Sequence, residues 1–184
     1  MRIIGGTAGG RHIKIPKSLP IVPSAGKVKM ALFEILKHEL AGASVLDLYG
    51  GSGNLALEAL SRGAAKAVLS DNEPDCVNVI KENAVLLGFA AQAECLALEA
   101  ERAVEELKRN GEKFDIIIID PPYLAGQISL ILKCLETNDI LKSEGVIAIK
   151  RDGKEAVPEG TAFIMEKEKK YGGTFLTFLR KAKK

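Results

Sequence analysis

The sequence is poor in cysteine and contains no long hydrophobic run. Its three cysteines, Cys76, Cys95 and Cys134, form no CxxC pair, which argues against a disulfide framework and against a zinc site. The first ten residues hold no apolar segment of the kind that a signal peptide needs. Charged residues also interrupt every apolar run before about 18 residues, the length of a membrane-spanning helix. We therefore expect an intracellular, cytoplasmic protein that uses no metal and contacts no membrane.

Charge is unevenly distributed along this chain of 184 residues, whose length and composition are typical of one globular domain. Residues 1–33 carry six basic side chains and no acidic one, residues 34–149 carry ten basic and nineteen acidic ones, and residues 150–184 carry ten and five. The net charge of +2 therefore hides two basic ends around an acidic middle. If the two ends share one face, that face would attract phosphate groups, although solubility alone also explains a lysine-rich surface.

Short apolar runs alternate with amphipathic helical patterns through most of the chain. This alternation predicts an α/β fold, in which helices cover both faces of a parallel sheet. The expected strands are residues 44–49, 66–70, 92–96, 114–119 and 145–150, and the expected helices are residues 27–40, 54–61, 74–87, 99–109 and 128–135.

The two ends of the chain depart from this alternation. Residues 161–167 and 174–179 resemble two strands, which should be antiparallel because their connection is too short for a crossover helix. Strand-like pieces around paired glycines in residues 1–16 indicate a hairpin. We therefore assign residues 1–25 to an N-terminal hairpin arm and linker, and residues 26–184 to the main domain.

A glycine-rich turn follows the first expected strand, near whose end Asp47 lies. Gly51 and Gly53 would let the backbone approach a ligand where a Cβ atom would clash, at the strand edge where α/β sheets bind ligands. Asp71 ends the second strand, where a carboxylate can accept both hydroxyl hydrogens of a ribose. These positions indicate an adenosine-type cofactor. A carboxylate at Asp47 would repel phosphate but suits the sulfonium and amino groups of S-adenosylmethionine, which the sequence therefore favours.

Other interpretations of this region stay open. Glu99 follows the third expected strand and could reach the adenine ring, although a solvated carboxylate at a helix N-terminus explains it equally well. The glycines and Asp71 also fit a dinucleotide fingerprint, which leaves a nicotinamide-binding protein as an alternative. A plain tight turn beside a solvated Asp71 is the third interpretation. The candidate cofactor-binding residues are Asp47, Tyr49, Gly51, Gly53, Asp71, Asn72 and Glu99.

Asp120-Pro121-Pro122-Tyr123 follows the fourth expected strand and is the most specific motif in the chain. Two prolines fix the backbone and remove two N–H donors, so the Asp120 carboxylate and the Pro121 carbonyl can face a ligand as acceptors. Tyr123 offers a flat face on which a nucleobase can stack. This set suits the exocyclic amine of a base, whose developing charge the acceptors would offset during transfer of a methyl group. We therefore take Asp120, Pro121, Pro122 and Tyr123 as candidate catalytic residues; the alternative is a rigid turn in which Tyr123 only packs.

Several short motifs occur in a fixed order along almost the whole chain. They are MRIIGG at the start, the segments Pro23–Leu36, Leu46–Tyr49, Gly51–Gly53, Leu57–Ala64 and Asp120–Tyr123, and Tyr171-Gly172-x-Thr174. In this order they resemble the bacterial 16S ribosomal RNA guanine-N2 methyltransferases of the small DPPY type. The chain departs from that family at Val22–Lys27, where the family usually has Arg-Pro-Thr-Thr-Asp-Arg.

The resemblance implies a Rossmann-like, seven-stranded S-adenosylmethionine methyltransferase sheet with its last strand antiparallel, beside an N-terminal hairpin arm. Residues 26–184 would then be the methyltransferase domain. The implied reaction moves a methyl group from S-adenosylmethionine to N2 of a guanine in 16S ribosomal RNA and leaves S-adenosylhomocysteine. Asp71 would bind the ribose, Glu99 the adenine, and Asp120–Tyr123 the guanine.

The implied partner is ribosomal RNA or the small ribosomal subunit, and we expect the protein to act as a monomer. The basic side chains at the start of the chain would hold RNA phosphates. The candidate RNA-binding residues are Arg2, Arg11, Lys14, Lys27 and Lys29.

Two further alternatives remain. The acceptors of Asp120–Tyr123 fit any exocyclic amine, so an adenine-N6 methyltransferase on DNA or RNA is one of them. The departure at Val22–Lys27 permits the other, a non-catalytic RNA-binding relative that keeps the fold.

Overall fold

The chain folds around one seven-stranded sheet in the computed structural model, which describes residues 1–17, 25–122, 126–158 and 160–182. The helices are α1 (Ala25–Ile35), α2 (Asn54–Ser61), α3 (Pro74–Leu87), α4 (Ala100–Arg109) and α5 (Gln127–Asn138). The strands are β1 (Ser44–Asp47), β2 (Lys66–Ser70), β3 (Ala93–Leu96), β4 (Phe114–Ile119), β5 (Leu141–Asp152), β6 (Phe163–Tyr171) and β7 (Thr174–Lys181). Among the described residues, no helix combines the length and the apolar character that crossing a membrane requires.

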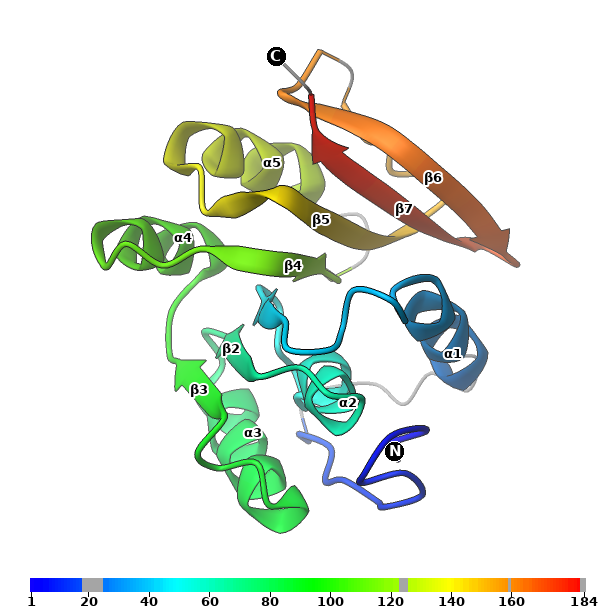
Figure 1. The fold of residues 1–184 in the computed structure, drawn as a ribbon, viewed down its shortest axis with the longest axis vertical. Coiled ribbons are helices and arrows are strands. Elements are labelled where there is room, and N and C mark those ends of the chain that lie inside the picture. The colour runs from blue at the N-terminus through cyan, green and yellow to red at the C-terminus, as the bar shows by residue number, and fades with distance from the viewer. Residues whose placement is uncertain (18–24, 123–125, 159, 183–184) are drawn as a thin grey trace.

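The strand order is β3-β2-β1-β4-β5-β7-β6, which Figure 1 shows as one continuous twisted sheet. β1 pairs in parallel with β2 on one side and with β4 on the other, and β4 pairs in parallel with β5. β7 runs antiparallel to both β5 and β6. The expected α/β sheet of seven strands with the last strand antiparallel is therefore confirmed. This topology collects the carboxyl ends of β1, β2, β4 and β5 at one edge.

The last four residues of β4, Ile116–Ile119, are all apolar because helices cover the sheet on both faces. Ile116 and Ile118 pack in a core with residues of α1, α2 and α3. Ile117 and Ile119 face the other way and pack with residues of α4 and α5. Because consecutive side chains of a strand alternate between the two faces, a strand buried on both sides needs apolar residues at every position.

The structure confirms four predicted elements to the residue, namely α2, β2, α3 and β4, and moves the ends of others. The first helix ends at Ile35 rather than at Leu40, although Leu36 and Leu40 remain buried in the turn that follows. β5 begins at Leu141 rather than at Gly145, because an irregularity in its pairing with β4 lets exposed polar residues belong to the strand. Apolar periodicity misplaced both ends, since it reports burial rather than backbone conformation.

The N-terminal segment turns back on itself with one antiparallel bridge, between Arg2 and His12, instead of two hairpin strands. It lies against α2 and does not project from the body of the protein (Figure 1). Ile3 and Ile13 are buried in the same core as α1, α2 and α3. The division of the chain at residue 25 stays a prediction, but the described part of this segment shares its core with the main domain.

Glu58 on α2 joins this segment to the sheet domain through a buried ion cluster. Its fully buried carboxylate accepts the backbone N–H groups of Ile4 at 2.7 Å and Gly5 at 2.8 Å. The same carboxylate pairs with Lys29 of α1 at 2.9 Å and with Arg62 at 2.7 Å. Burial alone would raise the pKa of Glu58, but the hydrogen bonds from Ile4 and Lys29 hold it below its usual value. Glu58 is therefore ionised at neutral pH and connects the N-terminal segment, α1 and α2.

Replacing Glu58 by alanine should destabilise the protein strongly, because Lys29 would remain buried without its carboxylate partner. We expect Glu58→Ala to lower the free energy of unfolding, measured by urea denaturation, by about 3–5 kcal/mol. The matched control is Glu82→Ala, which removes the exposed partner of Lys14 and should cost less than about 1 kcal/mol. Equal losses in the two variants would contradict the role assigned to the cluster.

Candidate active site

The carboxyl edge of the sheet opens into a cavity of about 810 Å³, a volume suited to a small-molecule ligand. Its lining combines the turn after β1, the residues that follow β2 and β4, and the end of β5. The predicted cofactor-binding and catalytic residues that line it are Asp47, Tyr49, Gly51, Asp71, Asn72, Glu99, Asp120, Pro121 and Pro122, and Lys29 lines it as well. The two motifs found in the sequence therefore face one shared cavity.

The turn after β1 is shaped by glycines in the left-handed region. Gly51 has φ 55° and Gly53 has φ 78°, values that L side chains rarely adopt. A Cβ atom on Gly53 would also approach Leu57 to 2.9 Å. Gly53 does not line the cavity itself; it precedes the first residue of α2 and lets the chain enter that helix. The turn thus brings the Gly51 backbone to the cavity wall.

Asp47 is buried at the end of β1 and is electrostatically strained. One of its carboxylate oxygens, Oδ1, has no hydrogen-bond partner among the residues that the structure describes. Burial, and next the negative charge of Asp120, raise the pKa of Asp47 to about 7. An unsatisfied buried carboxylate oxygen at the cavity wall is suited to a cationic ligand.

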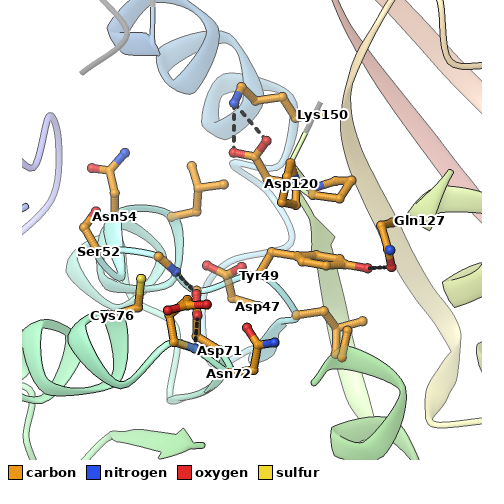
Figure 2. Close-up of a pocket in the computed structure, with 18 of the residues that line it drawn as sticks. Asp47, Tyr49, Ser52, Asn54, Asp71, Asn72, Cys76, Asp120, Gln127 and Lys150 are labelled. Atoms are coloured by element: carbon orange, nitrogen blue, oxygen red, sulfur yellow. Dashed lines mark hydrogen bonds and ion pairs between the residues drawn. The ribbon is translucent and has the colours of Figure 1, made fainter. Parts of the chain in front are cut away.

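Asp71 follows β2 and is held by backbone donors at the rim of the glycine turn. Its Oδ2 accepts the N–H of Gly51 at 2.7 Å and its Oδ1 accepts the N–H of Glu73 at 3.0 Å (Figure 2). Asn72 is exposed beside it. Glu99 is also exposed and immediately precedes α4 without capping it through its side chain, so both interpretations made from the sequence remain compatible with its position.

Asp120 lies directly after β4, and the end of β5 supplies its partner. Both carboxylate oxygens of Asp120 are 2.8 Å from Nζ of Lys150, as Figure 2 shows. Burial raises the pKa of Asp120, and the Lys150 ammonium opposes that rise. Pro121 is buried and Pro122 exposed at the same wall. Tyr123 lies outside the described residues.

Sequence reasoning missed Lys150 and Gln127. Lys150 stands at the carboxyl end of an expected strand, so the reasoning that selected Asp47 and Asp120 could have found it. Gln127 opens α5, and its Oε1 accepts a long hydrogen bond of 3.5 Å from the Tyr49 hydroxyl. Burial, and next the nearby Glu101, raise the pKa of Tyr49, so its hydroxyl stays protonated. No feature of the sequence around Gln127 indicated a role.

The prediction that Lys29 contacts RNA phosphates is wrong, because only 4% of Lys29 is exposed. Its ammonium donates to the Arg2 carbonyl at 2.7 Å and to Oδ1 of Asn54 at 2.6 Å, besides its pairing with Glu58. A phosphate would have to displace three partners at once from a side chain that is already buried.

The other four candidate RNA contacts are exposed, and their proposed role stays a prediction. Arg11 donates to the carbonyls of Leu86 and Leu87, at the end of α3. Lys14 pairs with Glu82 at 2.9 Å. Two of the four cations therefore already have protein partners at the surface, which a phosphate would have to share.

The cavity fits S-adenosylmethionine in three respects. Asp47 offers an unsatisfied oxygen for a cation, Asp71 offers a carboxylate for ribose hydroxyls, and the glycine turn brings backbone close to the ligand. An S-adenosylmethionine-dependent methyltransferase is the class of protein that this sheet and this cavity define. Residues 1–180 match the family described as Conserved hypothetical protein 95, and the chain belongs to that family.

Relatives of known name agree with this class. Ribosomal RNA small subunit methyltransferase D of Escherichia coli (strain K12) is 31% identical over 158 residues, which cover 86% of this chain and 78% of the relative. The protein of the same name from Haemophilus influenzae is 27% identical over 169 residues, 91% of this chain and 88% of the relative. A solved structure of a hypothetical protein from Thermus thermophilus has a TM-score of 0.83 at 29% identity, covering 98% of this chain and 99% of that one. The family resemblance inferred from the motifs is confirmed, and the nicotinamide-binding alternative loses its support.

Cofactor binding should depend on pH through Asp47. Because the pKa of Asp47 is about 7, part of the protein carries a proton there that must leave before a cation can bind. We expect the affinity for S-adenosylmethionine, measured by calorimetry, to fall by up to about tenfold for each pH unit below 7 and to level off above it. Asp47→Asn should bind more weakly and lose this dependence. Asp115→Asn, at the opposite edge of the sheet, should keep it; an unchanged pH dependence in Asp47→Asn would refute the assignment.

Proposed function

We propose that this protein methylates ribosomal RNA of the small subunit, and that its target is the exocyclic N2 of a guanine. The observation that carries the proposal is the shared cavity, which Asp47 and Asp71 line beside Asp120, Pro121 and Pro122. The names of the relatives in Escherichia coli and Haemophilus influenzae support the class of RNA. The acceptor set at the end of β4 supports an amine as the methylated group.

S-adenosylmethionine supplies, when bound, a methyl group on a positively charged sulfur. The amine nitrogen of a base is a poor nucleophile because its lone pair is delocalised into the ring. Asp120 and the Pro121 carbonyl would accept the two amine hydrogens and favour a nitrogen whose lone pair points at the methyl group. Holding the methyl donor and the amine close together in one cavity would increase the rate further. Under this proposal, the carboxylate of Asp120 would also accept the proton that the amine loses.

The target base would have to leave its stack to reach this cavity, as enzymes that act on bases generally require. Under this proposal the ring of Tyr123 stacks on the extruded base. The remaining exposed cations at the start of the chain, Arg2, Arg11, Lys14 and Lys27, would hold flanking phosphates. The expectation that the protein acts as a monomer stays a prediction.

The reaction can be tested with small ribosomal subunits that lack the modification. We expect methyl transfer from labelled S-adenosylmethionine and, after digestion to nucleosides, recovery of the label in N2-methylguanosine. Label in N6-methyladenosine would support the adenine alternative instead, because the acceptors of the site fit either amine. Failure of the folded, cofactor-binding protein to transfer any label to these subunits would remove the proposed substrate.

Asp120→Ala should separate catalysis from cofactor binding. We expect kcat to fall by about 10²–10³-fold, because a preorganised acceptor at the reacting nitrogen is lost, while S-adenosylmethionine affinity changes little. Asp115→Ala is the matched control. Asp115 belongs to β4, the strand that Asp120 follows, and pairs with Lys142 at 2.8 Å, but at the edge away from the cavity. A large loss of cofactor affinity in Asp120→Ala would show that the residue belongs to the cofactor half of the site.

A further inference from the structure

The ion pair between Asp120 and Lys150 is built by the sheet itself. Ile119 of β4 is in register with Ile149 of β5, so the next residues along the two parallel strands are Asp120 and Lys150. Nζ of Lys150 lies 2.8 Å from both carboxylate oxygens, and each side chain is less than a quarter exposed. The register of the two strands therefore places the two residues side by side at the cavity wall.

The surroundings of this pair are acidic. Lys29, the other lysine at the cavity wall, is committed to Glu58 and Asn54. Among the described residues, six carboxyl groups line the cavity against these two lysines: Asp47, Asp71, Glu73, Glu99, Glu101 and Asp120. Within the described part of the chain, Lys150 is thus the cation that pairs with Asp120. Asp47 on β1 is close enough for the charge of Asp120 to raise the pKa of Asp47.

We propose that Lys150 is a positioning residue for methyl transfer, which holds the Asp120 carboxylate ionised and in one orientation toward the amine of the bound base. The inference rests on the proposed function for its substrate and on the ion pair for its geometry. Lys150 acts here through Asp120 and not by contact with the reacting atoms. No step of the reaction is assigned to its own proton.

The reason is electrostatic. Burial raises the pKa of Asp120, and the negative charge of Asp47 lies close by. Without the ammonium of Lys150, Asp120 would shift further toward the protonated acid. A protonated carboxyl group carries a donor in place of an acceptor, so it offsets less of the charge on a methylated amine. The ammonium of Lys150 is shared by both oxygens, so it also disfavours rotation of the carboxylate away from the base.

The chain supplies a matched control for this pair. Lys142 and Asp115 belong to the same two strands, β5 and β4, and also form an ion pair at 2.8 Å. That pair lies at the amino end of β4, away from the cavity, and its lysine is 45% exposed. Lys142→Met therefore removes an equivalent charge from β5 without touching the site.

The first test is the pH dependence of kcat. The measurement uses saturating S-adenosylmethionine, so that the effect of Asp47 on cofactor binding does not contribute to the profile. We expect Lys150→Met to lower kcat at pH 7 by at least about tenfold, to move the acidic limb of the profile to higher pH, and to recover part of the activity there. In Lys150→Arg and in Lys142→Met, both kcat and the position of the acidic limb should stay near the wild-type values. A uniform loss at every pH with an unmoved limb would overturn the proposal.

The second test needs neither RNA nor turnover, so it can fail or succeed independently of the proposed function. The ¹³C carboxyl resonance of Asp120, assigned by comparison with Asp120→Asn, is followed by NMR through a pH titration of the cofactor-free protein. We expect the titration midpoint to rise in Lys150→Met and to stay near the wild-type midpoint in Lys150→Arg and Lys142→Met. An unchanged midpoint in Lys150→Met, with the native fold retained, would show that Lys150 does not govern Asp120.

Discussion

The parallel pairing of β1 with β4 is the constraint on which the site depends. Asp47 is in register with Ile118, so Asp120 lies two residues further along the neighbouring strand. Val45 and Leu46 pack in the cores on opposite faces of the sheet. A slip of one residue would exchange these faces, which the buried core forbids. The apolar packing of the sheet thus fixes the separation of two carboxylates that take no part in that packing.

This arrangement is electrostatically unfavourable for the protein alone. Asp47 is buried with an unsatisfied oxygen and sits near the charge of Asp120, and both effects raise its pKa. A cationic ligand would satisfy the buried oxygen and offset the repulsion from Asp120. Part of its binding energy would therefore come from strain already present in the protein. Lys150 compensates the negative charge of Asp120, whereas the charge of Asp47 remains available to a cationic ligand. The site therefore keeps one carboxylate satisfied and the other available, as a two-substrate cavity requires.

The sequence was sufficient for the sheet and for the acidic half of the site. The four consecutive isoleucines of β4 indicated burial on both faces. Asp47, Asp71 and Asp120 could be found because each stands at the end of an apolar run. The lysines were harder to assign, because a pattern gives the position of a charge and not its partner. Lys29 looks like a surface cation on an amphipathic helix, yet Glu58 draws it into the core. Lys150 stands at a predictable strand end, but its pairing with Asp120 depends on the register of β4 and β5, which no local pattern specifies.

The charge of the cavity also bears on how a polyanion could use it. Six carboxyl groups against two lysines, one of them committed to Glu58, favour a cation and repel a phosphodiester chain. A nucleobase is neutral, so an extruded base can enter where its phosphates cannot. Base extrusion would then meet two requirements of the proposed reaction together: it exposes the amine, and it keeps the charged backbone outside the acidic cavity. The cations that hold that backbone must accordingly lie around the mouth of the cavity and not within it.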